Sequence, residues 1–518
     1  MRVLAWLAAF ALATCACCAG AVERAELDRI FDDVMHRYEL PGLAVGVIEE
    51  GRIVYARTAG ERVAGSGQPI TRRTLFKIAS NSKAMTAATL ARLVDAGKLR
   101  WDDPVVHHLP TFRLFDDWVT RNIQVQDLLV HNSGLPEGGG DLMLWPEPNR
   151  FTRADILAGL AHIRPAYGFR AGYAYDNLLY VVAGEVAAAA GDGSYEALVR
   201  REVFEPLGLG CRVGAWRREA GDDVAQPHLR RDGRNLPSGV DGDAVPAITS
   251  AAAGGIRCSL DDMLRWALVW LAPGEREHAW LSAAQREAMW KPRTTMPVSA
   301  RSKAWDGTHY RGYALGFRVA DADGEWTVSH TGTLSGMYSV LFLLPDRRGG
   351  FVMLTNGEGG EARTVVTESL LKRFTRPDDT RRVADFAADL ARDRTVPGRS
   401  RVPDTASRVP VEPERIGADL GIWRDPWFGD VAICARSGKV RFESAKSPRM
   451  AGTVMCVGER LLVEWDSDAV DVEPWLDFGR GERAGTLAMA KVDPDGDFSS
   501  DYEDLALRRL RACREASP

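Results

Sequence analysis

The sequence lacks features that mark several large classes of protein. Its formal net charge is only −5 over 518 residues, and neither sign forms a long run, so the chain has no obvious electrostatic surface for nucleic acid or an anionic membrane. The apolar stretch at residues 3–13 is too short to span a bilayer. No internal repeat is present. We therefore expect chemistry on a small molecule or peptide, with no nucleic acid partner.

Cysteine is scarce beyond the N-terminus, and its spacing forms no C-x-x-C pair or His-paired metal signature. We expect no metal and no cofactor. Three of the eight cysteines lie within residues 1–21, and the other five are Cys211, Cys258, Cys434, Cys456 and Cys513. An odd count leaves at least one unpaired in a monomer. Cys434 and Cys456 lie on strand-like segments, so we weigh a disulfide between them against two buried free thiols.

The N-terminus has the pattern of an export signal. Arg2, the apolar residues 3–13 and the small residues Ala19-Gly20-Ala21 predict a cleavable secretory peptide, cut after Ala21. The alternative is lipoprotein processing at Cys15, since Leu12-Ala13-Thr14-Cys15 resembles a lipobox, although Thr departs from the usual small residue. We expect a periplasmic or secreted protein with no transmembrane segment in the mature chain, and a lipid anchor is the less favoured alternative.

The length favours two domains rather than one core. Residues 22–375 mix helical and strand-like patterns. Residues 376–415 are rich in Arg, Asp, Pro and Ser, which is typical of a linker, with a short helical pattern at 383–392. Residues 416–512 are short strand-like pieces divided by glycine-rich turns, which predicts a small β-barrel or sandwich.

Hydrophobic periodicity predicts the elements of the first domain. Helical patterns occupy residues 21–38, the stretch from Ser80 to Gly97, and residues 125–129, 154–160, 177–190, 260–271 and 362–374. Ser259 is the expected N-cap of the helix at 260–271. Strands are expected at residues 43–47, 53–58, 326–328, 338–344 and 350–354, with a hairpin loop at 345–349. The domain is therefore expected to be α/β, in the α+β arrangement.

The most informative short motif is Ser80-x-x-Lys83 at the start of a helix. Residues three apart on a helix are neighbours on one face, so the Lys amine can lie within reach of the Ser hydroxyl, which needs a base to become a nucleophile. Alone, this motif arises by chance about once or twice in a chain of this length.

Two further triplets change that reading. Tyr175-Asp176-Asn177 opens a helical stretch, and His330-Thr331-Gly332 closes a strand-like segment. In this order, the three motifs resemble those of the serine β-lactamase and penicillin-binding-protein superfamily. Other stretches resemble its structural signposts: Asp102-Asp103-Pro104, residues 128–135, Pro206-Leu207-Gly208-Leu209, Gly254-Gly255, Asp262-Met263 and Leu354-Thr355-Asn356.

The resemblance covers residues 27–374 and is nearest to the class C-like branch with its esterases and D-stereospecific peptidases. It implies an antiparallel sheet flanked by helices, together with an all-helical region. The tail segments at residues 425–430 and 497–505 are similar to the lipocalin-like barrel domain that follows some of these hydrolases.

The resemblance and physical need together assign the catalytic roles. Ser80 is expected to attack a carbonyl carbon at the positive end of a helix and become acylated. Lys83 holds or accepts the proton, which requires that its pKa fall from about 10.4. Tyr175 is the other candidate base, or the acid that protonates the leaving group. The choice of base between Lys83 and Tyr175 is left open.

Substrate binding is assigned to Asn177, His330, Thr331, Gly332 and Thr333. Asn177 is expected to donate to the substrate carbonyl, and the backbone N–H groups of Ser80 and Thr333 to form the oxyanion hole. Gly332 is expected to leave room for substrate beside the strand.

His330 departs from the Lys of many relatives. An ordinary His is mostly neutral at pH 7, so a substrate carboxylate should be held more weakly, although a purely structural His is the alternative. His131 is assigned to structure. The loop at residues 138–145 either rims the site or is a flexible surface loop.

We expect an exported peptidase or amidase for short or D-amino-acid-containing peptides. The alternatives are a carboxylesterase, a weak β-lactamase, and a peptidoglycan-binding sensor that acylates without turnover. A homo-oligomer formed through the C-terminal domain also remains open.

Overall fold

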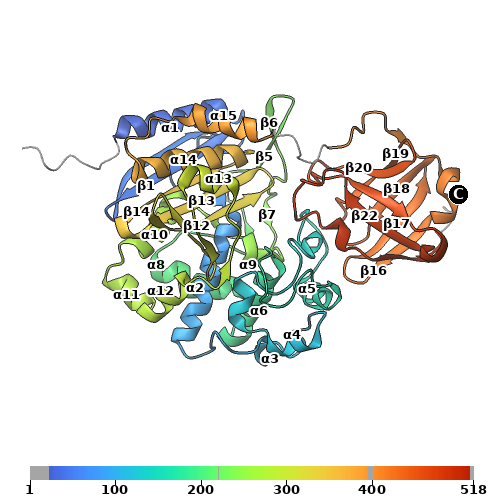
Figure 1. The fold of residues 1–518 in the computed structure, drawn as a ribbon, viewed down its shortest axis with the longest axis horizontal. Helices are drawn as coiled ribbons and strands as arrows, with labels where there is room; N and C mark the ends of the chain where they lie inside the picture. The colour runs from blue at the N-terminus through green and yellow to red at the C-terminus, as the bar shows by residue number, and fades with distance from the viewer. Residues whose placement is uncertain (1–22, 220, 395–401, 514–518) are drawn as a thin grey trace, which may run out of the picture.

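The computed structural model describes residues 23–219, 221–394 and 402–513, which form a larger mixed domain and a separate barrel beside it (Figure 1). The expected signal peptide and the lipobox at Cys15 lie outside these residues. Within them, no helix is both long and apolar enough to cross a membrane.

The larger domain is built on an eight-stranded antiparallel sheet. The strand order is β2-β1-β14-β13-β12-β11-β10-β9. The strands are β1 Gly42–Glu49, β2 Arg52–Gly60, β9 Thr294–Thr295, β10 Arg311–Tyr313, β11 Arg318–Ala322, β12 Glu325–Leu334, β13 Met337–Leu344 and β14 Gly349–Thr355. Because β1 pairs with β14, the N-terminal hairpin is joined directly to the last strands of the domain.

Three helices cover one face of this sheet (Figure 1). They are α1 Arg24–Arg37, α14 Gly360–Thr375 and α15 Val383–Arg394. Leu27 and Phe31 of α1 share a buried cluster with Val366 and with Phe386 of α15. The helix expected at 383–392 is therefore present and packs on the larger domain. On this packing we place the domain boundary after α15, and residues 395–401 lie outside the described chain.

The opposite face carries the helical region. α10 Leu260–Leu271 packs against β1, β13 and β14, and Ser259 caps it with a reciprocal bond to Asp262, as predicted. Below it lie α2 Ser82–Asp95, α6 Leu178–Gly191 and α9 Ala251–Gly254, which contact one another. Several shorter helices complete the region: α3 Val105–His108, α4 Asp117–Asn122, α5 Arg153–Gly159, α7 Tyr195–Val199, α8 Glu205–Leu207, α11 Glu275–Trp280 and α12 Ala283–Trp290. The short helix α13 Ala300–Asp306 instead packs beside α14 and α15 through Trp305.

Short strands and single turns connect these parts. The strands form pairs: β3 Phe76–Lys77 with β8 Arg257–Cys258, β4 Trp216–Arg217 with β7 Ala244–Val245, and β5 His228–Arg231 with β6 Arg234–Pro237. The single turns are η1 Ala79–Asn81, η2 Val125–Leu129, η3 Asp141–Met143, η4 Leu160–His162, η5 Arg200–Phe204 and η6 Pro345–Arg347. Residues 125–129, predicted as helical, form the tighter 3-10 type.

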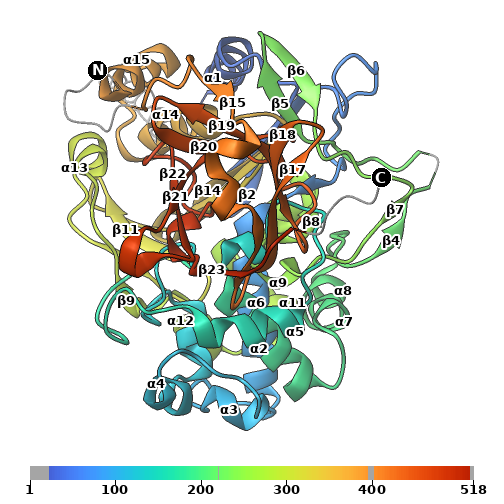
Figure 2. The ribbon, with the colours of Figure 1, turned by 90° about the vertical axis from the view of Figure 1, so that its right-hand side faces the viewer.

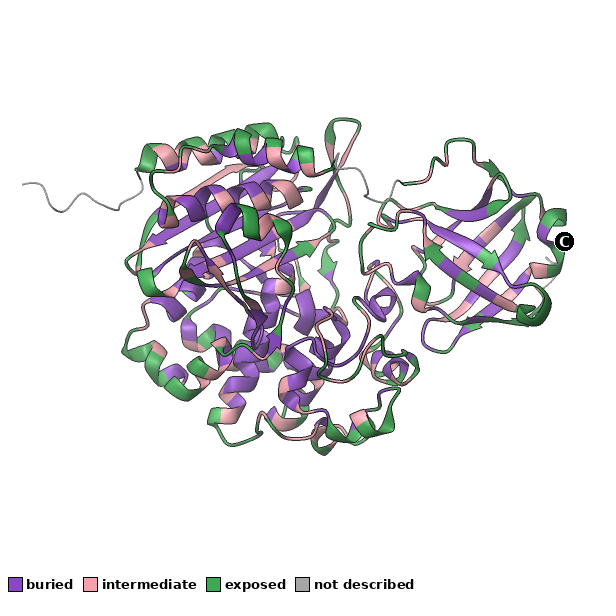
Figure 3. Ribbon diagram, in the orientation of Figure 1, coloured by how far each residue is buried: buried purple, intermediate pink, exposed green. Residues whose placement is uncertain are grey.

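The C-terminal domain is a closed antiparallel barrel, viewed face-on in Figure 2. Its strands are β16 Gly421–Asp425, β17 Gly429–Arg436, β18 Lys439–Ser444, β19 Ala451–Val457, β20 Arg460–Trp465, β21 Pro474–Phe478, β22 Thr486–Lys491 and β23 Leu507–Arg511. Pairing of β19 with β20 closes the ring, and β15 Val409–Pro410 adds to β19. The turns are η7 Pro413–Asp419, η8 Gly481–Arg483 and η9 Tyr502–Asp504. Along β16, β18 and β22, buried residues alternate with more exposed ones (Figure 3).

The structure corrects the cysteine pairing. Cys434 forms a disulfide with Cys513, and Cys211 forms one with Cys258. Cys456 remains a buried free thiol. Of the two alternatives weighed for Cys434 and Cys456, the disulfide between them is wrong, because β17 and β19, which carry these residues, lie on either side of β18. The other alternative, two free thiols, is right for Cys456 alone.

Candidate active site

Ser80 lies in the η1 turn, between β3 and α2, and is partly exposed. The sequence predicted that it opens a helix, and the turn does lead directly into α2. The preceding residue, Ala79, has a φ of +49°, a conformation that costs free energy for a residue with a Cβ. Such strain clusters at functional sites, and here it sets the entry of the chain into the turn that presents the Ser80 hydroxyl.

Lys83 is fully buried, and its amine faces Ser80. Nζ donates to Ser80 Oγ at 3.1 Å, to Asn177 Oδ1 at 2.7 Å and to the Ala253 carbonyl at 3.0 Å. Burial lowers the pKa of Lys83 to about 7, against the opposing influence of Asp141 and Asp176. About half of the amine is then neutral at pH 7 and able to accept a proton.

Tyr175 and Asn177 lie just before α6, on the other side of the Lys83 amine. Lys83 Nζ is 4.9 Å from the centre of the Tyr175 ring. Burial raises the pKa of the Tyr175 phenol, and a hydrogen bond with Ser80 acts in the opposite direction. His131, assigned to structure from the sequence, packs on Tyr175 with ring centres 4.2 Å apart and accepts a bond from the Asp176 N–H. The sequence motifs Ser80-x-x-Lys83 and Tyr175-x-Asn177 therefore meet in space.

The third motif lies on β12, which the sequence predicted to end at the motif but which continues to Leu334. Gly332 packs against the η1 turn: a Cβ there would collide with the Ile78 carbonyl and the Ser339 hydroxyl. Its lack of a side chain therefore lets β12 approach the residues that precede Ser80. Thr333 is exposed beside this contact.

His330 is fully buried rather than presented to solvent. Its Nε2 is 2.7 Å from the Tyr313 hydroxyl, and its Nδ1 is 2.7 Å from the Thr331 carbonyl. Burial lowers the pKa of His330, and the nearby Arg318 and Lys83 add to that effect. The imidazole is therefore neutral at pH 7 and supplies no fixed positive charge.

Arg318 on β11, which sequence reasoning missed, places a cation next to the motif residues. Its Nη1 donates to Thr331 Oγ1 at 2.7 Å, its Cζ lies 5.9 Å from the Tyr175 ring centre, and its buried Nε has no partner. Arg363 of α14 reaches the same strand and donates to the Gly332 carbonyl and to Thr333 Oγ1. Neither arginine stands out in the sequence: Arg318 is the first residue of β11, which also contains the charged Asp321.

Asp141, also missed from the sequence, lies behind Asn177. Its Oδ2 accepts from Asn177 Nδ2 at 2.8 Å and from Ser499 Oγ of the barrel at 2.8 Å. It is fully buried, and burial raises its pKa to about 8. The loop at residues 138–144 is buried against the site and the barrel, so it is not a flexible surface loop.

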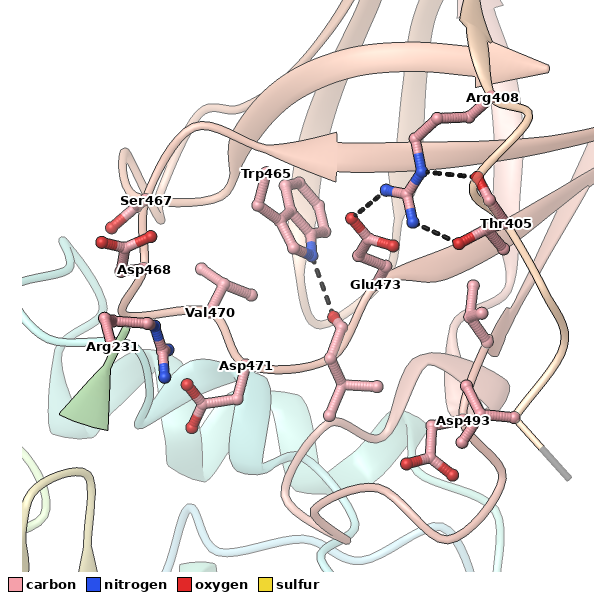
Figure 4. Close-up of a pocket in the computed structure, with 13 residues that line it drawn as sticks. Arg231, Thr405, Arg408, Trp465, Ser467, Asp468, Val470, Asp471, Glu473 and Asp493 are labelled. Atoms are coloured by element: carbon pink, nitrogen blue, oxygen red, sulfur yellow. Dashed lines mark hydrogen bonds and ion pairs between the residues drawn. The ribbon is translucent and has the colours of Figure 1, made fainter. Parts of the chain in front are cut away.

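A separate pocket of about 420 Å³ lies where the barrel meets the β5–β6 hairpin (Figure 4). Its lining is polar and includes Arg231, Asp468 and Asp471, with Arg408 paired to Glu473 at 2.6 Å. None of the candidate catalytic residues lines it. The chemistry of the three motifs therefore does not extend into this pocket.

Comparison with known proteins decides the family. Residues 27–372 match the family described as Beta-lactamase. The chain belongs to the beta-lactamase family. This match ends before the barrel begins and spans all three motifs, and members of the family act as serine hydrolases.

Several relatives within the beta-lactamase family carry different activities in their names. The chain is 28% identical over 354 residues to the unguisins hydrolase ungD' of Aspergillus campestris, covering 64% of this chain and 61% of that protein. It is 26% identical to penicillin-binding protein 4 of Amycolatopsis lactamdurans, covering 65% and 86%. It is 29% identical to esterase EstB of Burkholderia gladioli, covering 64% and 90%. The chain thus spans about three fifths of the first of these proteins.

Solved structures extend the likeness of the fold. The octameric penicillin-binding protein homologue from Pyrococcus abyssi has a TM-score of 0.58 at 18% identity, over 94% of this chain and all of that one. The class C beta lactamase from Rhodobacter sphaeroides has a TM-score of 0.53 at 21% identity, over 68% and 99%. The first likeness covers both domains and the second covers the larger one alone.

Proposed function

We propose that this chain is an exported hydrolase that forms an acyl-enzyme on Ser80, with short peptides ending in a carboxylate, including those that contain D-amino acids, as substrates. One observation carries the proposal. The Ser80 hydroxyl lies 3.1 Å from the amine of a fully buried lysine, within the distance that proton transfer requires. Export rests on the signal pattern at residues 1–21.

Lys83 is the proposed general base of acylation. Its amine, with a pKa near 7, is neutral often enough to take the Ser80 proton, whereas burial moves the pKa of the Tyr175 phenol upward. A phenol must ionise before it can act as a base. As Ser80 Oγ bonds to the substrate carbonyl carbon, its proton passes to Lys83 Nζ.

Tyr175 is then the proposed acid. Its phenol, close enough to the Ser80 side chain to have its pKa lowered by it, gives a proton to the leaving amine as the carbon–nitrogen bond breaks and is reprotonated from Lys83. Water attacks the acyl-enzyme in the second half-reaction, with the same residues acting in reverse.

The N–H groups of Ser80 and Thr333 are the proposed oxyanion donors, each worth about 100-fold in rate. One N–H of Asn177 is held by Asp141, and the other remains for the substrate carbonyl.

The arginines support a substrate that carries a carboxylate. Burial lowers the pKa of the Arg363 guanidinium to about 10, and the positive charge of nearby Arg318 adds to this shift. Among the described residues, neither has a carboxylate partner. Buried cations are normally paired, so an anionic group of the substrate is the expected partner. A substrate carboxylate beside Thr331 would complete the bonding of Arg318.

The test is labelling by an active-site phosphonate, followed by turnover on matched substrates. Ser80→Ala should abolish labelling, and retained labelling would remove Ser80 as the nucleophile. A panel of D-peptides, short-chain esters and a chromogenic cephalosporin then ranks the activities, and we expect the highest kcat/KM with peptides. A single burst equal to the enzyme concentration, with no steady-state rate, would instead favour a sensor.

A homo-oligomer is also part of the proposal. The support is that the Pyrococcus abyssi homologue is octameric, together with a likeness that covers both domains. Light scattering of the purified full chain tests it. A mass equal to one chain at micromolar concentration would contradict it.

A further inference from the structure

A short segment of the barrel, residues 497–501, lies against the larger domain next to the active site, and we call it the strap. It follows β22 and precedes η9. Within the strap, the Ser499 N–H donates to Asp497 Oδ1, and Lys491 Nζ of β22 donates to the Ser500 carbonyl. The strap is therefore held both by its own bonds and by the barrel.

The strap binds the loop at residues 138–142 through hydrogen bonds and close packing. The carboxylate of Asp501 accepts from the backbone N–H groups of Gly140, at 2.6 Å, and Leu142, at 3.1 Å. Gly138, with a φ of +71°, fits directly under Phe498, since a Cβ there would lie 2.5 Å from the Phe498 carbonyl. This contact explains why glycine is needed at that point of the loop. Both the Asp501 carboxylate and the loop are buried.

The strap is connected to Lys83 through the side chains of Asp141 and Asn177. Ser499 Oγ and Asn177 Nδ2 both donate to the same oxygen of Asp141, at 2.8 Å each. An amide has one donor end and one acceptor end, so with Nδ2 on Asp141 its Oδ1 must face Lys83, where it accepts from Nζ at 2.7 Å. The chain of bonds therefore runs from Ser499 through Asp141 and Asn177 to the amine beside Ser80.

We propose that the strap is part of the active site: Ser499 and Asp501 position Asp141, which orients Asn177 and so aims the Lys83 amine at Ser80. The barrel is then required for efficient acylation rather than only for access or assembly. The proposal rests on the proposed roles of Ser80 and Lys83. Phe498, 38% exposed and packed edge-on to Tyr175 at 5.8 Å, also borders the place where substrate meets Tyr175.

Charge gives the strap a second effect on Lys83. The strap helps to bury Asp141, and burial raises the pKa of both Asp141 and Asp501; the charge of Asp141 adds to the shift of Asp501. The hydrogen bonds from Ser499 and Asn177 act in the opposite direction on Asp141, and the ionised form of Asp141 raises the pKa of Lys83. Loss of the Ser499 bond should therefore leave Asp141 more often protonated and lower the pKa of Lys83. The other charged groups facing Lys83 are Asp176 and Arg318, and neither touches the strap.

The test uses the full chain with Ser499→Ala and Asp501→Ala, and measures phosphonate labelling, kcat, KM and their pH dependence. Loss of a partner of a buried polar group typically costs fivefold to about a hundredfold. We expect a fall of that size in labelling rate and kcat, little change in KM and, for Ser499→Ala, a midpoint of the acid limb at lower pH. Ser499→Thr, which keeps a hydroxyl, should restore most of the rate.

Two control variants separate positioning from simple loss of docking. Ser500→Ala removes the neighbouring hydroxyl of the strap, which makes no hydrogen bond to the larger domain among the described residues. Lys446→Ala breaks a different contact between the domains, the ion pair with Asp155 at 2.5 Å. Both should keep wild-type kcat and the wild-type pH midpoint.

The outcomes are distinct. The proposal is overturned if Ser499→Ala keeps the wild-type kcat and midpoint, or if Lys446→Ala loses as much as Ser499→Ala. If Asp501→Ala does not fold, Ser499→Ala, which removes one oxygen, decides alone. Failure of the proposed function would appear separately, as phosphonate labelling that persists in Ser80→Ala. That result does not depend on what the strap variants show.

Discussion

Two of the lysines that the structure describes are completely buried, Lys372 and Lys83, and the groups around their amines differ in charge. Lys372 of α14 pairs with Asp306 at 2.8 Å and Asp323 at 2.6 Å. Lys83 of α2 contacts a hydroxyl, an amide oxygen and a backbone carbonyl. Among the described residues, no carboxylate forms an ion pair with it.

The difference distinguishes a lysine that stabilises the fold from a lysine that takes part in catalysis. A buried ammonium that must stay charged is given carboxylates, which offset its desolvation. A buried amine that must lose its proton is given neutral acceptors, so burial is the largest influence on its pKa. The first arrangement ties α14 to α13 and to the β11–β12 turn, and the second leaves a base beside Ser80.

The largest expected effect comes from removing the catalytic lysine. Lys83→Met should lower kcat/KM by about 10² to 10⁴, the usual contribution of a positioned base. It should also stabilise the fold at pH 6, because a buried lysine with a lowered pKa costs free energy below that pKa, and the cost disappears above the unfolded value near 10.4. Activity assays and denaturation at pH 6 check this pair of results. Wild-type activity in this variant would refute the assignment.

Removing the structural lysine should lower stability and leave the reactivity of Ser80 unchanged. Lys372→Met leaves Asp306 and Asp323 buried without their cation, which should lower the free energy of unfolding by about 3–5 kcal/mol. Labelling of Ser80 in the folded fraction should be unchanged. The matched control is Lys98→Met at an exposed lysine, and equal stability of the two variants would contradict the role of the Lys372 pairs.

A third variant makes the surroundings of Lys83 resemble those of Lys372 by adding a carboxylate. Asn177→Asp places a carboxylate 2.7 Å from Lys83, so the pKa of Lys83 should rise and activity at pH 7 should fall about tenfold for each unit. Activity should recover at higher pH. Asn122→Asp, on the surface of α4, serves as the control. A pH profile identical to wild type would show that Lys83 does not govern it.

The smallest effect should concern the substrate rather than the base. Arg318→Gln should raise KM about tenfold or more for a peptide with a free carboxylate. The same peptide with an amidated C-terminus should be cleaved at an unchanged rate. Equal changes for both peptides would remove the role of Arg318 as the carboxylate partner.

The sequence predicted the parts of the molecule that depend on local pattern. The helix after Ser80, the capping of α10 by Ser259 and the strands β17 to β20 follow from periodicity, caps and glycine turns within a few residues. The three motifs are also local, so Ser80, Lys83, Tyr175 and Asn177 could be named in advance and are found together.

What the sequence could not predict depends on contacts between distant segments. Arg318 lies 13 residues before Thr331, and only the pairing of β11 with β12 brings them together. Asp141 and Ser499 are 358 residues apart, and no pattern in either segment marks the bond. The Cys434–Cys513 disulfide was missed for the same reason, because barrel closure decides which strands are neighbours.

The most direct test of the account is the pH dependence of phosphonate labelling at Ser80 in the wild-type chain and in Lys83→Met. Lys83 acts only when neutral, so the wild-type rate should rise with pH through a midpoint near 7, and the variant should show a low rate without that limb. A midpoint near the ordinary lysine value of about 10.4, or a wild-type limb retained in Lys83→Met, would contradict the account.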